Sequence, residues 1–402
     1  MASPLSTQPA PVTAPGPTLL DALSLLAATG DELVVGTARD THRAVSDRVH
    51  GLVRRGTGVG SRPAEVLHRG IATAVYGALG TSLGGVARGL DRWAERGGGR
   101  PLDGDARGRF LTAAVNGLIG DELLRQRPQL AIAMSVRDRG RDVPIEPGTL
   151  AQTFPDATGR VAVFLHGLCE DESCWELHRE ATGTTYPDAL AGLGWTPVRV
   201  RYNSGLAVRE NGAALSALLQ ELVDAWAVPV EQIALVGHSM GGLVARAAGA
   251  VVAEEEVGVP WARRTTDVVT LGSPHLGSHL ASGAAGGSSL LRILPESAAF
   301  SERILERRSA GIRDLTRGLG HDLPPSPHVR HHLVAATVTG SARHPLGRAV
   351  GDLLVHPTSA VGRDRAGREV FADADRLHVG RTGHFGLLNH PEVLAALREW
   401  LR

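Results

Sequence analysis

Hydrophobic and polar residues change their spacing once along the chain, close to Pro128. Over residues 19–128, apolar residues recur at every third or fourth position between glycines and prolines, which predicts a helical region. Over residues 129–402, short apolar runs rich in β-branched residues alternate with longer helical stretches, which is typical of a parallel sheet with crossover helices. Residues 1–18 are rich in proline and predict a flexible tail. The pattern therefore predicts an α/β fold preceded by a helical region.

Eight runs in the second region have the length and composition of β-strands. We expect them to form one mostly parallel eight-stranded sheet with helices on both faces. The predicted strands are Ala131–Arg137, Val143–Glu146, Val161–Leu165, Thr196–Tyr202, Ile233–Val236, Asp267–Leu271, Leu333–Thr339 and Leu377–Val379.

Two segments of the helical region have patterns of their own. Asp31–Arg55 places its valines and leucines on one broad face and its charged residues largely elsewhere, which predicts an amphipathic helix. Ile71–Leu90 is weakly polar and rich in glycine, with two Gly-xxx-Gly spacings. We expect a glycine-faced helix packed closely against another helix; the alternative is peripheral membrane contact through these N-terminal helices.

The composition is that of an ordinary soluble globular protein. Hydrophobic residues make up 43% and charged residues 21%, with a formal net charge of +0, so we expect no nucleic acid among the partners. The sequence contains no lysine, which excludes Schiff-base catalysis and a Walker-type phosphate loop. Its N-terminus has prolines where the apolar core of a signal peptide would lie, so we expect a cytoplasmic protein.

The strongest chemical signal is the segment Gln232–Arg246, in which an apolar strand, a glycine-flanked turn and a helix follow one another. It contains a G-x-S-x-G nucleophile elbow in its full context, with Ser239 as the predicted nucleophile. Gly237 and Gly241 are required because the tight turn leaves no room for side chains there. The alternative, a tight turn with an incidental serine, does not explain the agreement between the motif and its predicted context.

A serine nucleophile needs an imidazole to take its proton and a carboxylate to orient that imidazole, in the chain order Ser, acid, His. His384 lies in a glycine-flanked loop directly after the last predicted strand, so we predict it as the base. Asp352 follows the predicted strand Leu333–Thr339, so we predict it as the acid. Its competitors Asp364, Asp373 and Asp375 lie in an Arg- and Asp-rich stretch that is typical of a solvated loop.

The oxyanion of the tetrahedral intermediate needs backbone N–H donors. We predict them at Met240, which follows the nucleophile, and at Leu168, in the loop after the strand Val161–Leu165. We expect neither a cofactor nor a metal ion, because the histidines in this part of the chain have no second ligand at metal-site spacing and are better explained as hydrogen-bonding residues; they are His166, His238, His275 and His279.

The sequence has two cysteines, Cys169 and Cys174, which are too few for a disulfide framework. Two unpaired thiols are the expected state in a reduced cell, and pairing across a small loop is the alternative under oxidation. A cysteine nucleophile is the minor alternative to Ser239.

Five segments in this order resemble the α/β-hydrolase superfamily, and within it lipase-like serine esterases similar to bacterial triacylglycerol lipases and the GPI inositol-deacylase-like group. The resemblance implies hydrolysis of a small-molecule or lipid ester, and it places a cap or lid in the insertion at about residues 276–330, for which a packed crossover helix is the alternative. The segments are His166–Leu168, Gly237–Gly242, Leu271–Ser278, Gly351–Asp352 with Ser359–Ala360 downstream, and Gly383–Pro391.

The chain departs from the lipase pattern in two places. The oxyanion loop continues with Glu170, Asp171 and Glu172, which predicts a charged rim at the cleft and argues against long-chain triglyceride as substrate. The helical region at 19–128 has no counterpart in a minimal lipase.

Three functional hypotheses remain at this stage. The first is ester hydrolysis through an acyl-enzyme on Ser239. The second is an acyltransferase or thioesterase that uses the same triad. The third is a non-catalytic binding module on a hydrolase fold, against which the complete triad argues.

Overall fold

The computed structural model describes residues 106–254, 260–278, 309–341, 350–364 and 366–402, together with the isolated residues 24, 85, 88, 89, 92, 344 and 347. An eight-stranded sheet runs through this part of the chain in the spatial order β2-β1-β4-β3-β5-β6-β7-β8. Strand β1 is antiparallel to both of its neighbours, and all other neighbouring strands are parallel. The predicted α/β fold with a mostly parallel sheet is confirmed.

Strands and helices alternate along most of the sheet. The strands are β1 (Ser135–Asp138), β2 (Arg141–Val143), β3 (Arg160–Leu165), β4 (Thr196–Arg201), β5 (Gln232–His238), β6 (Thr265–Leu271), β7 (Arg330–Thr337) and β8 (Asp375–Gly380). The α-helices are α4 (Ala106–Gln126), α5 (Pro147–Thr153), α6 (Arg179–Thr182), α7 (Tyr186–Ala191), α8 (Val208–Ala225), α9 (Met240–Glu254), α10 (Pro260–Arg264), α13 (Ala310–Arg317), α15 (Pro357–Ala360) and α16 (Pro391–Trp400). The 3-10 helices are η3 (Pro128–Leu130), η4 (Glu172–Glu176) and η6 (His384–Leu387).

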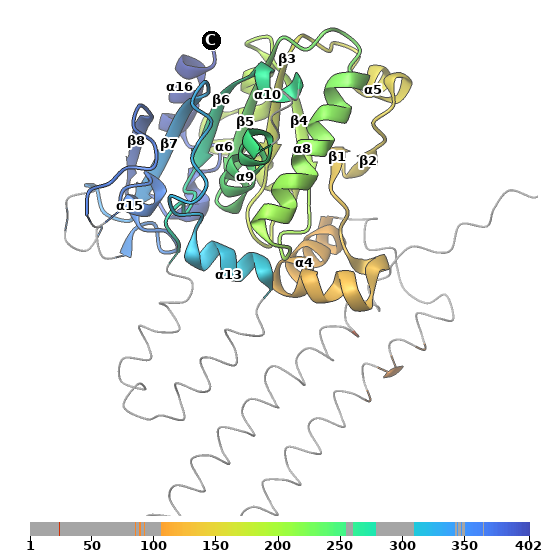
Figure 1. Ribbon diagram of the computed structural model, residues 1–402, viewed down its shortest axis with the longest axis horizontal. Coiled ribbons are helices and arrows are strands. Elements are labelled where there is room, and N and C mark those ends of the chain that lie inside the picture. The colour runs from red at the N-terminus through yellow and green to blue at the C-terminus, as the bar shows by residue number, and fades with distance from the viewer. Residues whose placement is uncertain are drawn as a thin grey trace, which may run out of the picture.

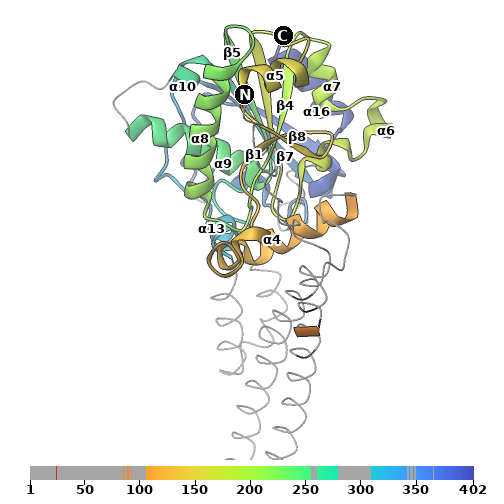
Figure 2. The ribbon, with the colours of Figure 1, turned by 90° about the vertical axis from the view of Figure 1, so that its right-hand side faces the viewer.

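Helices cover both faces of the sheet. Helices α8, α9 and α10 lie on one face, and α6, α7 and α16 lie on the other (Figure 2). The central strands β3 and β5 are apolar along most of their length because both of their faces are buried. Helices α8 and α9 pack so closely that a Cβ atom at Gly212 would lie 2.6 Å from that of Ala247. The absence of a side chain at Gly212 therefore sets the distance between these two helices.

Helices α4 and α13 lie together at one end of the sheet (Figure 1). Contacts with the segment after β4 show that this is the carboxyl end of the parallel strands. Asn203 Nδ2 donates to the Gly120 carbonyl of α4 at 3.1 Å. Ser309, which caps α13, donates from Oγ to the Gly117 carbonyl at 2.7 Å. Helix α4 is therefore fixed to the carboxyl end of the strands, where parallel α/β sheets carry their ligand sites.

Four predicted segments lie wholly or partly outside the described residues, and the proline-rich tail at 1–18 lies wholly outside them. Asp31–Arg55 lies wholly outside them, and of Ile71–Leu90 only residues 85, 88 and 89 are described, all of them helical. Residues 279–308 of the predicted cap are also outside, while its described part contains α13. Among the helices that the structure describes, none has both the length and the hydropathy needed to cross a membrane.

A hairpin at the sheet edge changes the first two predicted strands. Strands β1 and β2 are joined through Arg139 and Gly140, which both have positive φ, at 47° and 78°, as a two-residue type I′ turn requires. Strand β2 ends at Val143, because the following Pro144 has no N–H to donate to the sheet. The predicted strand Ala131–Arg137 therefore began too early, and Val143–Glu146 lies almost entirely beyond β2.

The acidic segment after the oxyanion loop is buried, so the predicted charged rim is wrong. Glu170, Asp171 and Glu172 are 9%, 3% and 6% exposed. Asp171 caps η4 by accepting a hydrogen bond from the Ser173 amide at 2.8 Å. Each acidic side chain has polar partners inside the protein, which is what allows it to leave the solvent.

Glu172 joins this segment to the sheet through two arginines. Its carboxylate accepts from Arg201 on β4 at 2.7 Å through both oxygens, and from Arg137 Nε on β1 at 3.2 Å. Burial raises the pKa of Glu172, but the hydrogen bond and charge of Arg201 outweigh burial and hold the pKa below its usual range. The buried carboxylate thus ties η4 to two neighbouring strands.

We predict that Glu172→Ala lowers the free energy of unfolding by about 3–5 kcal/mol, because it leaves two arginines without their shared buried partner. The loss should be seen as a lower denaturation midpoint in urea. Because the pKa of Glu172 is lowered on folding, its contribution is present above its unfolded pKa of about 4.3 and is lost as the pH falls through the folded value.

The matched control is Glu176→Ala in the same 3-10 helix. Glu176 pairs with Arg179 and Arg199 at 3.1 Å, but its side chain is 43% exposed, so we expect a loss of less than about 1 kcal/mol. Equal losses for the two variants would show that burial does not strengthen the Glu172 pairing.

Candidate active site

Ser239 lies in a strained turn between β5 and α9. Its φ is 53°, a value that residues with a side chain rarely adopt, and its amide donates to the Leu271 carbonyl at 2.8 Å. A Cβ atom at Gly237 would lie 2.3 Å from the Gly242 nitrogen, and one at Gly241 would lie 2.2 Å from the Leu165 carbonyl oxygen. Both glycines are therefore required for the helix to start this close to the strands.

His384 and Asp352 are hydrogen-bonded to each other. Nδ1 of His384 lies 2.7 Å from Oδ2 of Asp352, and the His384 amide donates to the Asp352 carbonyl at 3.0 Å. The other carboxylate oxygen, Oδ1, accepts from the amides of Leu354 at 3.0 Å and Val355 at 2.7 Å. Both residues are almost completely buried. The carboxylate is thus held by its own loop, with one oxygen directed at the imidazole.

The competing acids lie away from His384. Asp364 bonds to Arg368 at 2.7 Å within its own loop. Asp373 is exposed. Asp375, at the start of β8, is exposed as well and lies 2.9 Å from Nδ1 of His332. Of the four carboxylates considered from the sequence, the structure brings Asp352 to His384.

Two contacts place His384 beside the turn that carries Ser239. The ring of His238, the residue before Ser239, has its centroid 4.8 Å from that of His384. A Cβ atom at Gly272 would lie 3.1 Å from Cε1 of His384, and Gly272 directly follows the carbonyl that binds the Ser239 amide. The predicted nucleophile, base and acid therefore gather at the carboxyl ends of β5, β8 and β7.

The loop after β3 approaches Ser239 from the other side. A Cβ atom at Gly167 would lie only 3.0 Å from that of Ser239. The Gly167 amide donates to Glu170 Oε2 at 2.6 Å, and the Cys169 amide donates to Ser204 Oγ at 3.1 Å. Between them, the Leu168 amide has no acceptor among the hydrogen bonds of the described residues. The amide of Leu168, predicted as an oxyanion donor, is thus the one of these three with no acceptor in the described part of the chain.

Met240 provides the second predicted donor. It is the first residue of α9, and the first amides of a helix have no acceptor within the helix. The positive end of the helix dipole at this position also favours negative charge. The predicted donors Leu168 and Met240 thus belong to two segments that adjoin Ser239, the loop after β3 and the start of α9.

His166 fixes the start of the oxyanion loop. Its Nε2 accepts from the Tyr202 amide at 3.2 Å, so Nδ1 carries the proton and donates to the Gly167 carbonyl at 2.8 Å. The rings of His166 and Tyr202 stack with their centroids 4.3 Å apart. Burial lowers the pKa of His166 and keeps it in this neutral form. The structural hydrogen-bonding role expected for His166 is the one that the structure shows.

Sequence reasoning missed Glu170 as a residue of this site. Its carboxylate lies 3.0 Å from Nδ1 of His238 as well as bonding the Gly167 amide. Burial raises the pKa of Glu170, but the charge and hydrogen bond of His238 outweigh burial and lower the pKa to about 2. Only the histidine directly before Ser239 hinted at this pair in the sequence.

The two thiols are poor nucleophiles. Cys169 and Cys174 are not bridged. Burial raises the pKa of Cys169 to about 11, and Cys174 is shifted in the same direction by burial and by nearby carboxylates. A thiol with a raised pKa is not the activated thiolate that cysteine catalysis needs. Among the described residues, no group of His, Cys, Asp or Glu side chains could hold a metal ion.

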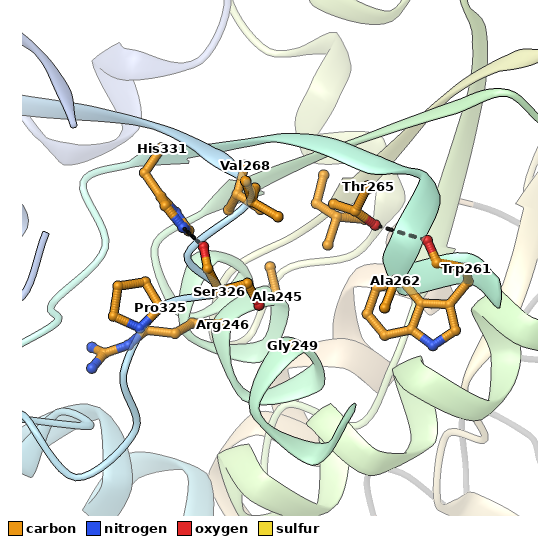
Figure 3. Close-up of a pocket in the computed structure, with 12 residues that line it drawn as sticks. Ala245, Arg246, Gly249, Trp261, Ala262, Thr265, Val268, Pro325, Ser326 and His331 are labelled. Carbon is orange, nitrogen blue, oxygen red and sulfur yellow. Dashed lines mark hydrogen bonds between the residues drawn. The ribbon is translucent and has the colours of Figure 1, made fainter. Parts of the chain in front are cut away.

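A pocket lies between α9, α10 and the strands β6 and β7 (Figure 3). Trp261, Val268 and other apolar side chains form much of its lining, with Arg246 and His331 at one side (Figure 3). None of the residues predicted for catalysis lines it. The pocket is therefore separate from the groups around Ser239.

Comparison with solved structures gives esterases and lipases at low identity. A mature Bacillus licheniformis lipase, BlEst2, is 19% identical with a TM-score of 0.42, covering 60% of this chain and 91% of its own. The Pyrococcus furiosus esterase Pf2001 is 15% identical with a TM-score of 0.39, covering 61% and 82%. The esterase RhEst1 from Rhodococcus sp. ECU1013 is 14% identical with a TM-score of 0.36, covering 61% and 92%.

No curated protein matches the sequence. The sequence profile of the family described as "Alpha/beta hydrolase family" matches residues 162–397, which is more than half of the chain. This span runs from β3 to α16 and includes all the residues gathered around Ser239. The chain belongs to the α/β-hydrolase family.

Proposed function

We propose that this hydrolase cleaves carboxylic esters through an acyl-enzyme on Ser239. The observation that carries the proposal is the 2.7 Å hydrogen bond between Asp352 and His384 beside the strained turn of Ser239. A serine on a turn with positive φ, an imidazole and a buried carboxylate form the arrangement that activates a hydroxyl. Family membership supports hydrolysis; this arrangement supports the choice of an acyl group as the part transferred.

In the first half of the reaction, Nε2 of His384 accepts the Ser239 proton while Oγ attacks the ester carbonyl. The resulting oxyanion accepts hydrogen bonds from the Leu168 and Met240 amides. When the intermediate collapses, the bond to the alcohol oxygen breaks and His384 gives its proton to the leaving alcohol. The acyl group is then esterified to Ser239.

In the second half, water takes the place of the alcohol. His384 accepts a proton from water while the water oxygen attacks the acyl-enzyme. It returns the proton to Ser239 Oγ when the carboxylic acid product leaves. Asp352 keeps the Nδ1–H of His384 directed at itself throughout, so that Nε2 stays available on the side of Ser239. The two backbone amides on Oδ1 hold the carboxylate in place for this task.

The surroundings of the site favour an apolar acyl group. Leu353 and Phe385 directly follow the acid and the base in the chain, and their side chains are 63% and 49% exposed. The acidic residues after Leu168 are buried, so they present no charged rim to a long acyl chain. We infer that the alkyl part of the ester contacts Leu353 and Phe385, with the carbonyl at Ser239.

We predict that wild-type protein hydrolyses p-nitrophenyl esters and is labelled on Ser239 by a fluorophosphonate probe, and that Ser239→Ala loses both properties. Removal of the nucleophile should lower kcat by at least about 10⁴-fold. Intact mass and peptide mapping identify the labelled residue. The control is Ser216→Ala on α8, where the hydroxyl bonds Trp261 Nε1 at 3.1 Å, away from the predicted triad; this variant should be labelled normally. A folded Ser239→Ala protein with full activity would exclude the proposal.

We predict that Asp352→Asn lowers kcat by about 10⁴-fold with little change in KM, because the amide can no longer hold the required tautomer of His384. Steady-state kinetics with a p-nitrophenyl ester measure both constants. Asp364→Asn is the matched control, since Asp364 is the competing acid and bonds Arg368 instead. If Asp364→Asn lost activity while Asp352→Asn stayed active, the catalytic acid would be Asp364 and not Asp352.

A further inference from the structure

We propose that Glu170 and His238 form a buried ion pair that positions the oxyanion loop and the base His384 as one unit and holds a positive charge beside that base. The inference rests on the proposed function, because it assigns a role relative to Ser239 and His384. Neither residue needs to touch the substrate, so both are positioning residues.

The carboxylate of Glu170 holds the start of the oxyanion loop through a hydrogen bond from Gly167. Its Oε2 accepts the Gly167 amide at 2.6 Å, and the Glu170 amide in turn donates to the Gly167 carbonyl at 3.4 Å. The first bond occupies the Gly167 amide, and the second holds the Gly167 carbonyl, which belongs to the same peptide group as the Leu168 N–H. The position of one oxyanion donor therefore depends on Glu170.

His238 continues the chain of contacts to the base. Nδ1 lies 3.0 Å from the Glu170 carboxylate, and Nε2 lies 3.4 Å from the His384 carbonyl oxygen. Both neighbours are acceptors, because an ionised carboxylate and a carbonyl have no proton to give. A ring that donates to both of them carries protons on both nitrogens and is positively charged. The pair is thus a carboxylate and an imidazolium, both shielded from water.

The other titratable groups around His238 do not provide an equivalent partner. From the loop after β7, Asp352 adds a favourable charge but bonds to His384, and from the loop after β8 the ring of His384 lies beside it. His166, from the end of β3, interacts with Glu170. Burial lowers the pKa of His238, but the charge and hydrogen bond of Glu170 outweigh burial and raise it. The positive charge therefore depends on Glu170.

A cation 4.8 Å from the ring of His384 has a direct effect on catalysis. Its charge repels the positive charge that His384 acquires when it accepts the Ser239 proton. Without the carboxylate, a buried His238 becomes neutral and this repulsion disappears. The pH dependence of Ser239 reactivity should therefore change when the pair is removed.

The test is the rate at which a fluorophosphonate labels Ser239, measured from about pH 5 to about pH 9 in wild type and Glu170→Gln. The glutamine keeps the shape and an acceptor for the Gly167 amide but removes the charge. We expect the midpoint of the rising limb to move up by about one pH unit, with a correspondingly lower rate on the acidic side. A purely structural role would lower the rate at all pH values without moving the midpoint.

The matched control is Asp267→Asn. Asp267 and His332 form another buried carboxylate–histidine pair, at 2.9 Å, but near the amino ends of β6 and β7 and therefore away from Ser239. This variant should keep the wild-type midpoint. An equal shift in Asp267→Asn, or an unchanged midpoint in folded Glu170→Gln, overturns the inference.

A second variant keeps the test decisive where Glu170→Gln does not fold. His238→Gln leaves Glu170 as an unpaired negative charge near the base, so its midpoint should move up at least as far. The double variant Glu170→Gln/His238→Gln should show a smaller shift than the sum of the two single variants, since each single change removes the same pair. Additive shifts contradict pairing. Wild-type protein that is never labelled on Ser239 overturns the proposed function as well, whereas labelled wild type with no variant shift overturns this inference alone.

Discussion

The close approach of α9 to the strands β3 and β5 is the constraint on which the site depends. The helix begins one residue after Ser239, and the neighbouring backbone leaves no room for a Cβ atom at Gly237 or Gly241. Ser239 lies between these glycines and carries its side chain at φ 53°, in the left-handed region. The buried sheet beneath and the packing of α9 against α8 over-determine this turn, which is how a folded protein maintains a locally unfavourable conformation. A relaxed turn would move the hydroxyl away from the groups that surround it.

Buried charge organises the other side of the site. The acidic segment after Leu168 turns inward, where Glu172 joins two strands through Arg137 and Arg201, and Glu170 contacts the Gly167 amide and His238. A carboxylate in such a place is stable only when its partners are fixed. The same segment therefore fastens the oxyanion loop to the sheet and links that loop to the histidine before Ser239. Stability and the proposed chemistry depend on shared contacts.

Much of the fold could be predicted because its signals are local. Apolar runs marked the central strands, and the glycines around Ser239 marked the turn, since both effects act over a few residues. Asp352 was separable from Asp364 because its position after β7 restricts where its side chain can lie. The edge hairpin was displaced in the prediction, because the turn formed by Arg139 and Gly140 decides where β1 ends and β2 begins.

Glu170 could not be found in this way. Its role depends on burial and on a histidine distant in the sequence, and a run of three acidic residues normally indicates a solvated surface. Tertiary contacts reversed that expectation by supplying His238 and two arginines as partners. The reversal also removes the charged rim that argued against long-chain triglyceride, and the proposed contacts of the acyl group are instead with the exposed Leu353 and Phe385.

The central claim is that an acyl group passes through Ser239, and the most direct measurement is to trap that intermediate. Wild-type protein mixed with a p-nitrophenyl ester and quenched in acid during turnover should gain the mass of one acyl group, and peptide mapping should place it on the peptide that contains Ser239. An acyl group on Cys169 or on any other residue, or active turnover with no covalent adduct at Ser239, would contradict the account.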